Sequence, residues 1–331
     1  MRAAALILAC ALLARVPATG PGLTRFEFRQ PHMGTTVRVV LYAGDAPAAE
    51  ALAASAFSRI AALDDRLSDY RESSELMALC RAAGGPAVGV SGDLFTVLTA
   101  AQAFASRTHG AFDVTIGPVS RVWRHARATG ELPEASRLAE AQRLVGHDKM
   151  HLSPEGRTVR LAERGMMLDL GGIAKGFAAD EALAVLAWGG ARHAIVAIGG
   201  DVAAGDPPPG EAGWEVGIAP LGPGRSGALP AVRLQRAAIS SSGDAEQYLE
   251  AGGEHFSHIV NPITGSAATG KRGVTVIAPT GMTADALATA VKVLGAARGL
   301  PVVDGMEGAA ALVVEDTPAG PREYRSKRWP R

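Results

Sequence analysis

The chain has 331 residues, of which 47% are hydrophobic and 20% are charged, so it is long and apolar enough to bury a sizeable core. Lysine and arginine together number 33, and so do aspartate and glutamate, which gives a formal net charge of zero. There is therefore no charge excess that would steer the protein toward nucleic acid or an anionic membrane.

The first residues differ in composition from the rest of the chain. Arg2 is followed by an apolar run over residues 3–13 and then by small residues. This pattern predicts a signal peptide over residues 1–18, because the run is shorter than the roughly 20 apolar residues of a membrane span. Cys10 lies inside the run and leaves lipidation as an alternative, but we favour cleavage at the end of the predicted segment. Cleavage would leave Cys80 as the only cysteine and would exclude an intramolecular disulfide.

Apolar spacing predicts the elements of the first half of the chain. Val37, Val39 and Leu41 alternate with other residues, and we expect their strand to pair with residues 26–28. Helical spacing then predicts helices over residues 46–67, 74–79, 93–108 and 134–144. Residues 110–118 are interpreted as a loop with an extended piece.

The second half is richer in predicted strands. Two short runs around a Pro-Glu-Gly turn predict a hairpin within residues 150–161. Further strands are expected at residues 194–198, 214–218, 231–234, 255–260 and 273–278, with one or two more within 302–314. Because strands arrive as hairpins rather than in strict alternation with helices, we predict an α+β fold with mainly antiparallel sheets flanked by helices. One domain would span residues 19–316, and residues 317–331 would form a loose basic tail.

One stretch combines a strand, a glycine turn and the start of a helix. Residues 166–170 are interpreted as a short buried strand, Gly171 and Gly172 break it, and helical spacing begins at Ile173. Such a junction presents backbone N–H groups and the positive end of a helix dipole to an anion. Lys175 opposes that dipole, so a bound phosphate would explain its position. A lysine that contacts only solvent is the alternative.

Asp285 and Thr289 lie four residues apart in a predicted helix over residues 283–294, which Thr283 would cap. This spacing places their oxygens on one helix face. Two hard oxygens together with a backbone carbonyl suit Mg²⁺, which also keeps waters and substrate phosphates. The alternative is a carboxylate near the helix N-terminus that stabilises the helix through the dipole alone.

Three further side chains keep two interpretations each. His258 lies among apolar neighbours and is either a structural histidine or a base. Asp113 is either a turn former or a carboxylate that contacts a ligand, and Tyr70 either stacks on a flat ring or packs. The sequence has no Walker lysine pattern, no dinucleotide glycine motif after a strand and no Cys/His spacing of a zinc site. Flavin or nucleotide binding therefore does not follow from any single motif.

Eight short segments nevertheless occur in a characteristic order along nearly the whole chain. They lie at residues 32–35, 67–76, 110–118, 168–176, 198–200, 241–243, 258–262 and 284–289. No one of them is specific, but in this order they resemble the ApbE family of FAD:protein FMN transferases.

The resemblance implies an α+β protein that is exported across the bacterial inner membrane, to the periplasm or the outer face of that membrane, and binds FAD and Mg²⁺. Such enzymes cut the FAD pyrophosphate, transfer FMN to a threonine hydroxyl of a partner redox protein and release AMP. By this analogy the FAD site would be lined by Met33, Tyr70, Ala111, Phe112, Asp113, Asp169, Lys175 and Val260. The metal would be held by the Gly172 carbonyl, Asp285 and Thr289, and His258 would be a candidate general base.

Two positions depart from the family's pattern. The family usually has threonine where Ser241 stands and aspartate where Asn261 stands. The serine keeps a hydroxyl, but the asparagine removes a carboxylate from beside His258 and could lower the basicity of the histidine. Two other functions stay open: a hydrolase that gives water the attack on FAD, and a non-catalytic exported flavin-binding protein.

Overall fold

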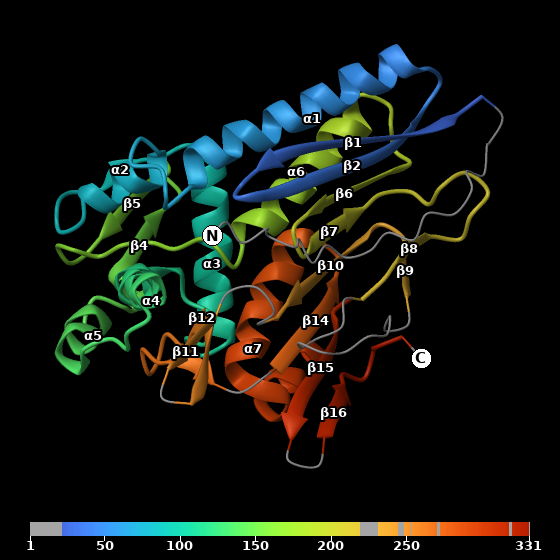
Figure 1. Cartoon of the computed structure of the whole chain (residues 1–331). Helices are drawn as coiled ribbons and strands as arrows, with labels where there is room; N and C mark the ends of the chain where they lie inside the picture. Colours follow the sequence, from blue (N-terminus) through green and yellow to red (C-terminus); the bar gives the residue numbers. More distant parts are fainter. Residues whose placement is uncertain are drawn as a thin grey trace.

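The computed structural model describes residues 22–218, 231–243, 248–251, 253–269, 272–317 and 320–330, and the predicted signal peptide lies outside these residues. An antiparallel sheet of eight strands is its largest element, in the order β1-β2-β6-β7-β10-β14-β15-β16 (Figure 1). The strands are β1 (Thr24–His32), β2 (Thr35–Ala43), β6 (Ala194–Ile198), β7 (Asp201–Ala204), β10 (Ala237–Ser242), β14 (Arg272–Ala278), β15 (Ala310–Thr317) and β16 (Gly320–Arg325). The predicted fold class is confirmed.

β1 and β2 form the hairpin that the alternating residues predict. The two residues that join the strands have left-handed backbone conformations, with φ of 51° at Met33 and 73° at Gly34. Two-residue turns of this kind match the right-handed twist of the paired strands. β2 then pairs with β6, so that Val37 lies opposite Ile198 from much later in the chain.

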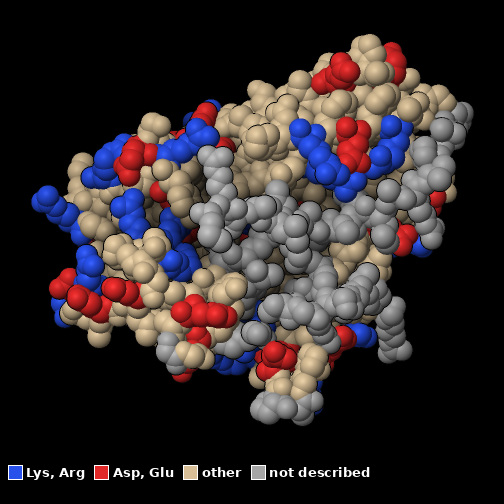
Figure 2. All heavy atoms as spheres, in the orientation of Figure 1, with Lys and Arg blue, Asp and Glu red and all other residues tan. Residues whose placement is uncertain are grey.

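The hairpin carries a compact group of charges on its outer face. Glu27 on β1 accepts hydrogen bonds from Arg25 at 2.9 Å, Arg29 at 2.8 Å and Arg38 at 2.7 Å. Burial acts to raise the pKa of Glu27, but the three guanidinium groups outweigh it and lower that pKa to about 2. In Figure 2 this area over β1 and β2 appears as acidic atoms flanked by basic ones.

Three helices pack together in the main core: α1 (Ala46–Leu67), α6 (Ala174–Trp188) and α7 (Gly281–Asp304). α6 packs between the other two helices, and Figure 1 shows α1 lying along the hairpin and α7 beside β10 and β14. Val37, Val39 and Leu41 of β2 join the helices in this core, since they share one face of the strand.

A second apolar cluster lies on the opposite face of the sheet. Val40 and Tyr42, which alternate with the core residues of β2, belong to it together with Trp214. The tryptophan comes from a two-stranded sheet of β8 (Trp214–Val216) and β9 (Val232–Leu234).

The loose C-terminal tail predicted from the sequence is wrong for residues 317 and 320–330, the part of it that the structure describes. β16 pairs with β15 along its length, and Trp329 is only 9% exposed in the second cluster. The charged residues of this segment suggested disorder, but β16 is an edge strand, and an edge strand keeps such side chains in solvent.

α7 differs from its prediction at both ends. Thr280, not Thr283, is the N-cap, and its side chain accepts the Thr283 N–H at 3.2 Å. Asp285 therefore lies in the second turn, where a capping or dipole role is weak. The helix continues past residue 294, with a break at Gly295, where φ is 73° and ψ is 173°.

Among the described helices, α7 alone is long and apolar enough to cross a membrane. Of its most apolar window, 56% is buried, which is typical of the core helix of a globular protein.

The remaining described elements surround the core. They are α2 (Glu75–Arg81), β3 (Val88–Gly89), α3 (Gly92–Arg107), η1 (Val114–Ile116), α4 (Gly117–Thr129), α5 (Ala135–Gln142), η2 (His147–Lys149), β4 (Met150–Ser153), β5 (Thr158–Leu161), β11 (Tyr248–Ala251), β12 (Glu254–Val260) and β13 (Ala267–Thr269). The strands form two small sheets, β3-β5-β4 and β11-β12-β13.

One local prediction is confirmed in part and one is wrong. Residues 110–113 form the predicted loop, in which Asp113 has an extended backbone, but the rest of the segment is helical, because the 3-10 turn η1 leads directly into α4. Pro118 occupies the first turn of α4, where its missing N–H costs nothing. Residues 166–170 are not a strand, because the Asp169 N–H donates to the Val114 carbonyl of η1 at 2.8 Å rather than to another strand.

Candidate functional site

Lys175 lies in the first turn of α6, as predicted, and its ammonium group meets oxygens from three segments. Nζ is 3.0 Å from the Gly171 carbonyl oxygen, 3.1 Å from Asp201 Oδ2 and 3.7 Å from Asp285 Oδ2. Burial acts to lower the pKa of Lys175, but the two carboxylates outweigh it and hold that pKa above its ordinary value. The alternative of a lysine that contacts only solvent is wrong.

The two carboxylates leave this group with an excess of negative charge. Asp201 at the start of β7 and Asp285 in α7 are each 3% exposed, and one ammonium group faces both. Burial first, and then the charge of Asp201, raises the pKa of Asp285 to about 7. A raised pKa of this origin means that nearby positive charge does not fully balance the negative charge of the buried carboxylate. A divalent cation would provide the missing positive charge.

The predicted metal ligands come from two segments that meet closely. Asp285 and Thr289 lie one turn apart on α7. A Cβ atom added at Gly172 would fall 2.7 Å from the Thr289 hydroxyl oxygen, so a glycine is required for this approach.

The donor set fits Mg²⁺. Within the residues that the structure describes, no group of three His, Cys, Asp or Glu side chains could hold a metal ion. A cation beside Asp285 would therefore rely on carboxylate, hydroxyl and carbonyl oxygens together. Hard oxygen donors with few carboxylates are the set that Mg²⁺ prefers, because it keeps several waters or substrate oxygens.

Two glycines allow α6 and α7 to cross at close range. A Cβ atom at Gly176 would lie 2.1 Å from the Gly281 carbonyl oxygen, so neither helix tolerates a side chain there. Asp180 accepts the N–H groups of Gly281 at 2.7 Å and Met282 at 2.9 Å. The Gly176 N–H donates to Asp285 Oδ2 at 3.1 Å. Asp285 of α7 therefore binds the backbone of the first turn of α6, whereas Asp180 of α6 binds the backbone at the start of α7.

Arg124 of α4 contacts two further predicted site residues, Asp169 and Tyr70, and also Asp69. Its Nη2 lies 2.5 Å from Asp69 Oδ2 and 2.8 Å from Asp169 Oδ2. The guanidinium group also lies 4.3 Å from the ring centroid of Tyr70, which is 75% exposed. Asp169 in turn accepts the Gly171 N–H at 2.9 Å. Tyr70 is thus an exposed ring backed by a cation, and the alternative of a packed tyrosine is wrong.

Asp113 has a structural role of its own. It is 6% exposed, and Oδ1 accepts the N–H and the hydroxyl of Thr115 at 2.8 and 2.7 Å, which starts η1. Burial raises the pKa of this carboxyl. Because the neighbouring Val114 carbonyl accepts the Asp169 N–H at 2.8 Å, the Asp113 turn nevertheless lies next to the Arg124 group.

The other predicted FAD residues present little side-chain surface. Ala111, Phe112 and Val260 are 1%, 3% and 9% exposed. Met33 lies at the hairpin tip, and its N–H donates to Asp64 at 3.3 Å, near the end of α1.

His258 and Val260 lie on β12, which contacts both α4 and α7. The following residue, Asn261, uses its side chain for a turn, since Oδ1 accepts the Ile263 N–H at 2.9 Å. An aspartate at this position would accept the same hydrogen bond. The expectation that Asn261 lowers the basicity of His258 stays a prediction, because an aspartate making this hydrogen bond would still carry a negative charge.

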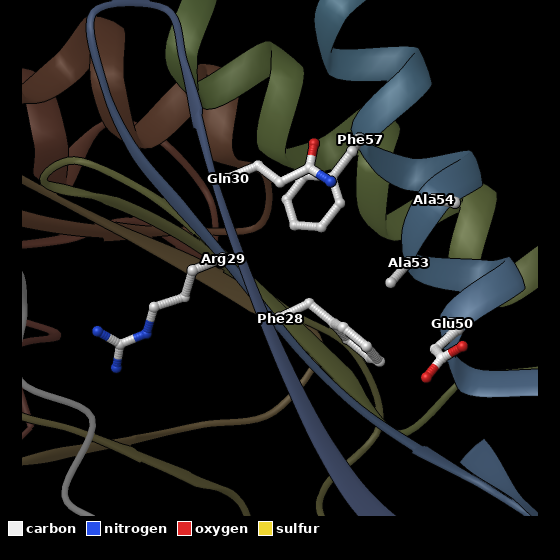
Figure 3. A pocket seen from close by; sticks show the side chains of 7 residues that line it. All are labelled: Phe28, Arg29, Gln30, Glu50, Ala53, Ala54 and Phe57. Atoms are coloured by element: carbon white, nitrogen blue, oxygen red, sulfur yellow. The ribbon is translucent and has the colours of Figure 1, made fainter. Parts of the chain in front are cut away.

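A hollow of 160 Å³ lies elsewhere, between β1 and α1. Figure 3 shows the rings of Phe28 and Phe57 on its two sides. No predicted site residue lines it; the lining consists of Phe28, Arg29, Gln30, Glu50, Ala53, Ala54 and Phe57.

A model of the ApbE family matches residues 33–313. The chain belongs to the ApbE family. Its relatives include enzymes named FAD:protein FMN transferase. The one from Treponema pallidum is 34% identical, and the match covers 85% of this chain and 82% of the relative. The one from Klebsiella pneumoniae is 30% identical, and the match covers 95% of this chain and 92% of the relative. The family predicted from the eight segments is confirmed.

Solved ApbE structures share the fold. The flavin transferase ApbE from Vibrio cholerae superimposes with a TM-score of 0.82 at 27% identity, over 92% of this chain and 98% of the other. The apo flavinyl transferase ApbE from Pseudomonas stutzeri superimposes with a TM-score of 0.82 at 28% identity, over 92% of this chain and 95% of the other.

The ApbE segments alone miss two residues of the charged groups. Asp201 directly follows one resembling segment, so that extending this segment by one residue would have found it. Arg124 lies in a charged region whose pattern gives no sign that its guanidinium group reaches Asp69 and Asp169.

Proposed function

We propose that this exported ApbE-family protein transfers FMN from FAD to a threonine hydroxyl of a partner redox protein, with Mg²⁺, and releases AMP. The observation that carries the proposal is the Lys175–Asp285 contact beside the close approach of Gly172 and Thr289. It joins a cation, a buried carboxylate and hard oxygens, which are the groups that binding of a diphosphate with Mg²⁺ requires. The names and coverage of the relatives support the same activity.

The proposed reaction exchanges one phosphate ester bond for another. The threonine oxygen forms a bond to the phosphorus on the FMN side, the pyrophosphate P–O bond breaks, and AMP leaves with that electron pair. The threonine proton passes to a base. Such transfer depends on positioning and charge neutralisation more than on covalent catalysis.

Six of the predicted site residues have a part in this proposed chemistry. Lys175 places a positive charge at the diphosphate, and Tyr70 offers a flat, exposed ring for stacking. Gly172 through its carbonyl, Asp285 and Thr289 would hold Mg²⁺, which neutralises phosphate charge when bound. His258 is the proposed base for the threonine proton.

The test is an incubation of the purified protein with FAD, Mg²⁺ and candidate redox subunits. We expect a covalent FMN mass on one threonine of the acceptor and one AMP for each FMN transferred. Loss of the mass when that threonine is changed to valine is the control. Acceptors that stay unmodified while other members of the family modify them would overturn the proposal.

Omitting the acceptor separates the two other functions. A hydrolase would release FMN and AMP over many turnovers without any acceptor. A non-catalytic flavin-binding protein would bind FAD tightly, release no AMP, and be indifferent to Mg²⁺. We expect slow release without the acceptor and Mg²⁺-dependent transfer with it.

A further inference from the structure

Asp201 is the member of the Lys175 group to which the proposed transfer assigns no part. Its Oδ2 lies 3.1 Å from Lys175 Nζ, within hydrogen-bond range, whereas Asp285 Oδ2 lies beyond that range at 3.7 Å. The Gly171 carbonyl accepts a second hydrogen bond from the ammonium group at 3.0 Å. Lys175 is therefore bound to Asp201 and Gly171, and it only adjoins Asp285.

An ammonium group and a divalent cation compete for one carboxylate. The lysine stem is flexible and its ammonium group has three donors, so it pairs with whichever acceptor is nearest. Asp285 cannot move away, because it is buried and the Gly176 N–H donates to its Oδ2 at 3.1 Å. Without a second carboxylate, Lys175 would pair directly with Asp285, and a metal would have to displace it.

We propose that Asp201 is a positioning residue that holds the Lys175 ammonium group away from Asp285 and keeps Asp285 available to a divalent cation. The inference rests on the proposed function, because it takes Asp285 as a metal ligand. It also explains why the group has two buried carboxylates for one lysine. Asp201 pairs with the lysine and Asp285 binds the metal. The two positive charges then lie side by side, where both can contact a diphosphate.

Two simpler roles of Asp201 make different predictions. A purely structural ion pair between α6 and β7 would change the melting temperature and leave metal affinity unchanged. A carboxylate that only adds negative charge would cause the same loss of metal affinity whether or not Lys175 is present. Positioning requires the loss to depend on Lys175.

The experiment measures Mn²⁺ binding to the full chain without FAD, from the electron paramagnetic resonance signal of the free ion, at pH 8.5 under nitrogen. Four proteins form a cycle: the unmodified chain, Asp201→Asn, Lys175→Met and the double variant. We expect Asp201→Asn to weaken Mn²⁺ binding roughly tenfold or more when Lys175 is present, and less than about threefold in the Lys175→Met background.

Equal losses in the two backgrounds, or no loss when Lys175 is present, would overturn the inference. Asp180→Asn is the matched control, because Asp180 is a neighbouring carboxylate that caps α7. It should change Mn²⁺ affinity by less than about threefold, and a loss as large as that of Asp201→Asn would also overturn the inference. If Asp201→Asn does not fold, Asp201→Ser gives the same comparison.

A fifth variant separates this inference from the proposed function. Asp285→Ala should abolish Mn²⁺ binding whatever stands at position 201. If Asp285→Ala binds Mn²⁺ normally, the metal site of the proposed function fails and the inference fails with it. If Asp285→Ala loses the ion but the cycle shows no dependence on Lys175, only the role of Asp201 is refuted.

Discussion

Lys175 is the residue through which the charge of FAD should be recognised. Only FAD presents a diphosphate, so Lys175→Ala should weaken FAD binding roughly tenfold to a hundredfold, the usual effect of losing a charge-assisted hydrogen bond. Riboflavin affinity should change by less than about threefold. Flavin fluorescence titrations in EDTA check both values, and EDTA removes any effect through the metal.

Lys149→Ala is the matched control for this prediction, because Lys149 pairs with Glu163 at 2.8 Å in another part of the fold. It should leave both affinities unchanged. A Lys175 variant that loses FAD and riboflavin equally would show that the lysine maintains the shape of the site and does not contact the phosphates.

His258 should affect the rate of transfer without affecting the binding of FAD. If it takes the threonine proton, His258→Ala should lower transfer roughly 10²–10⁴-fold at unchanged FAD affinity. Single-turnover transfer and FAD titration measure the two quantities. His255→Ala is the control on the same strand, since its ring stacks on Tyr248 at a centroid distance of 4.6 Å. Parallel loss of binding and transfer in His258→Ala would make the histidine a packing residue.

Sequence motifs located the candidate residues but not their partners. Lys175, Asp285 and Thr289 could be selected from residue type and spacing, because those describe a local segment. The contacts of Lys175 with Asp201 and of Arg124 with Asp69 join segments far apart in the chain. No local pattern encodes such contacts, since they depend on how the sheet and helices pack.

The crossing of α6 and α7 sets the geometry of the proposed metal ligands. Gly176→Ala would place a methyl group 2.1 Å from the Gly281 carbonyl oxygen, so the helices must separate. We expect a loss of about 2–3 kcal/mol in the free energy of unfolding, measured by urea denaturation. Gly89→Ala, where nothing lies within 4 Å of the added carbon, should change it by less than about 0.5 kcal/mol.

The charges on the hairpin of β1 and β2 should make the free energy of unfolding depend on pH. The folded-state pKa of Glu27 is about 2, below its ordinary value of 4.5, so the unfolded chain binds this proton more tightly. The carboxylate therefore stabilises the fold above pH 4.5 and loses that contribution as the pH falls toward 2. Because solvent screens these partly exposed charges, the contribution is on the order of 1 kcal/mol.

Glu27→Gln tests this dependence. The variant should be less stable than the unmodified chain at pH 7, and the difference should narrow as urea denaturation is repeated at pH 5, 4 and 3.5. Glu155→Gln, on an exposed turn, should show no such trend. A Glu27→Gln difference that is constant with pH would refute the charge-based account.

Elements were predictable where one apolar face decides them. α1 runs over the predicted residues 46–67 because seven of its residues are buried at helical spacing. α4 was missed within a charged region, because only one narrow face, with Val119, Trp123 and Ala126, is buried. The apolar residues of the segment 166–170 suggested a buried strand, yet strand formation also needs a neighbouring strand to hydrogen-bond with.

The C-terminal segment should contribute to the stability of the entire fold. Trp329 is 9% exposed in the cluster behind the sheet, so Trp329→Ala should cost about 3–5 kcal/mol in the free energy of unfolding. Trp188, 86% exposed at the end of α6, offers a matched control whose change to alanine should cost less than about 0.5 kcal/mol. Urea denaturation followed by circular dichroism measures both. Equal, small effects would restore the prediction of a loose tail.

The pairing of β2 with β6 also determines when the protein can fold. Val37 and Ile198 lie opposite each other but are separated by about 160 residues of chain, so their contact requires closing a very long loop. Synthesis delivers the hairpin first, and its apolar face has no sheet to join until β6 has emerged. Proteins dominated by such distant contacts fold slowly and expose aggregation-prone strands while they fold. We therefore expect the N-terminal hairpin to stay exposed for the whole of that interval, and a holding chaperone should bind residues 35–43 of the growing chain.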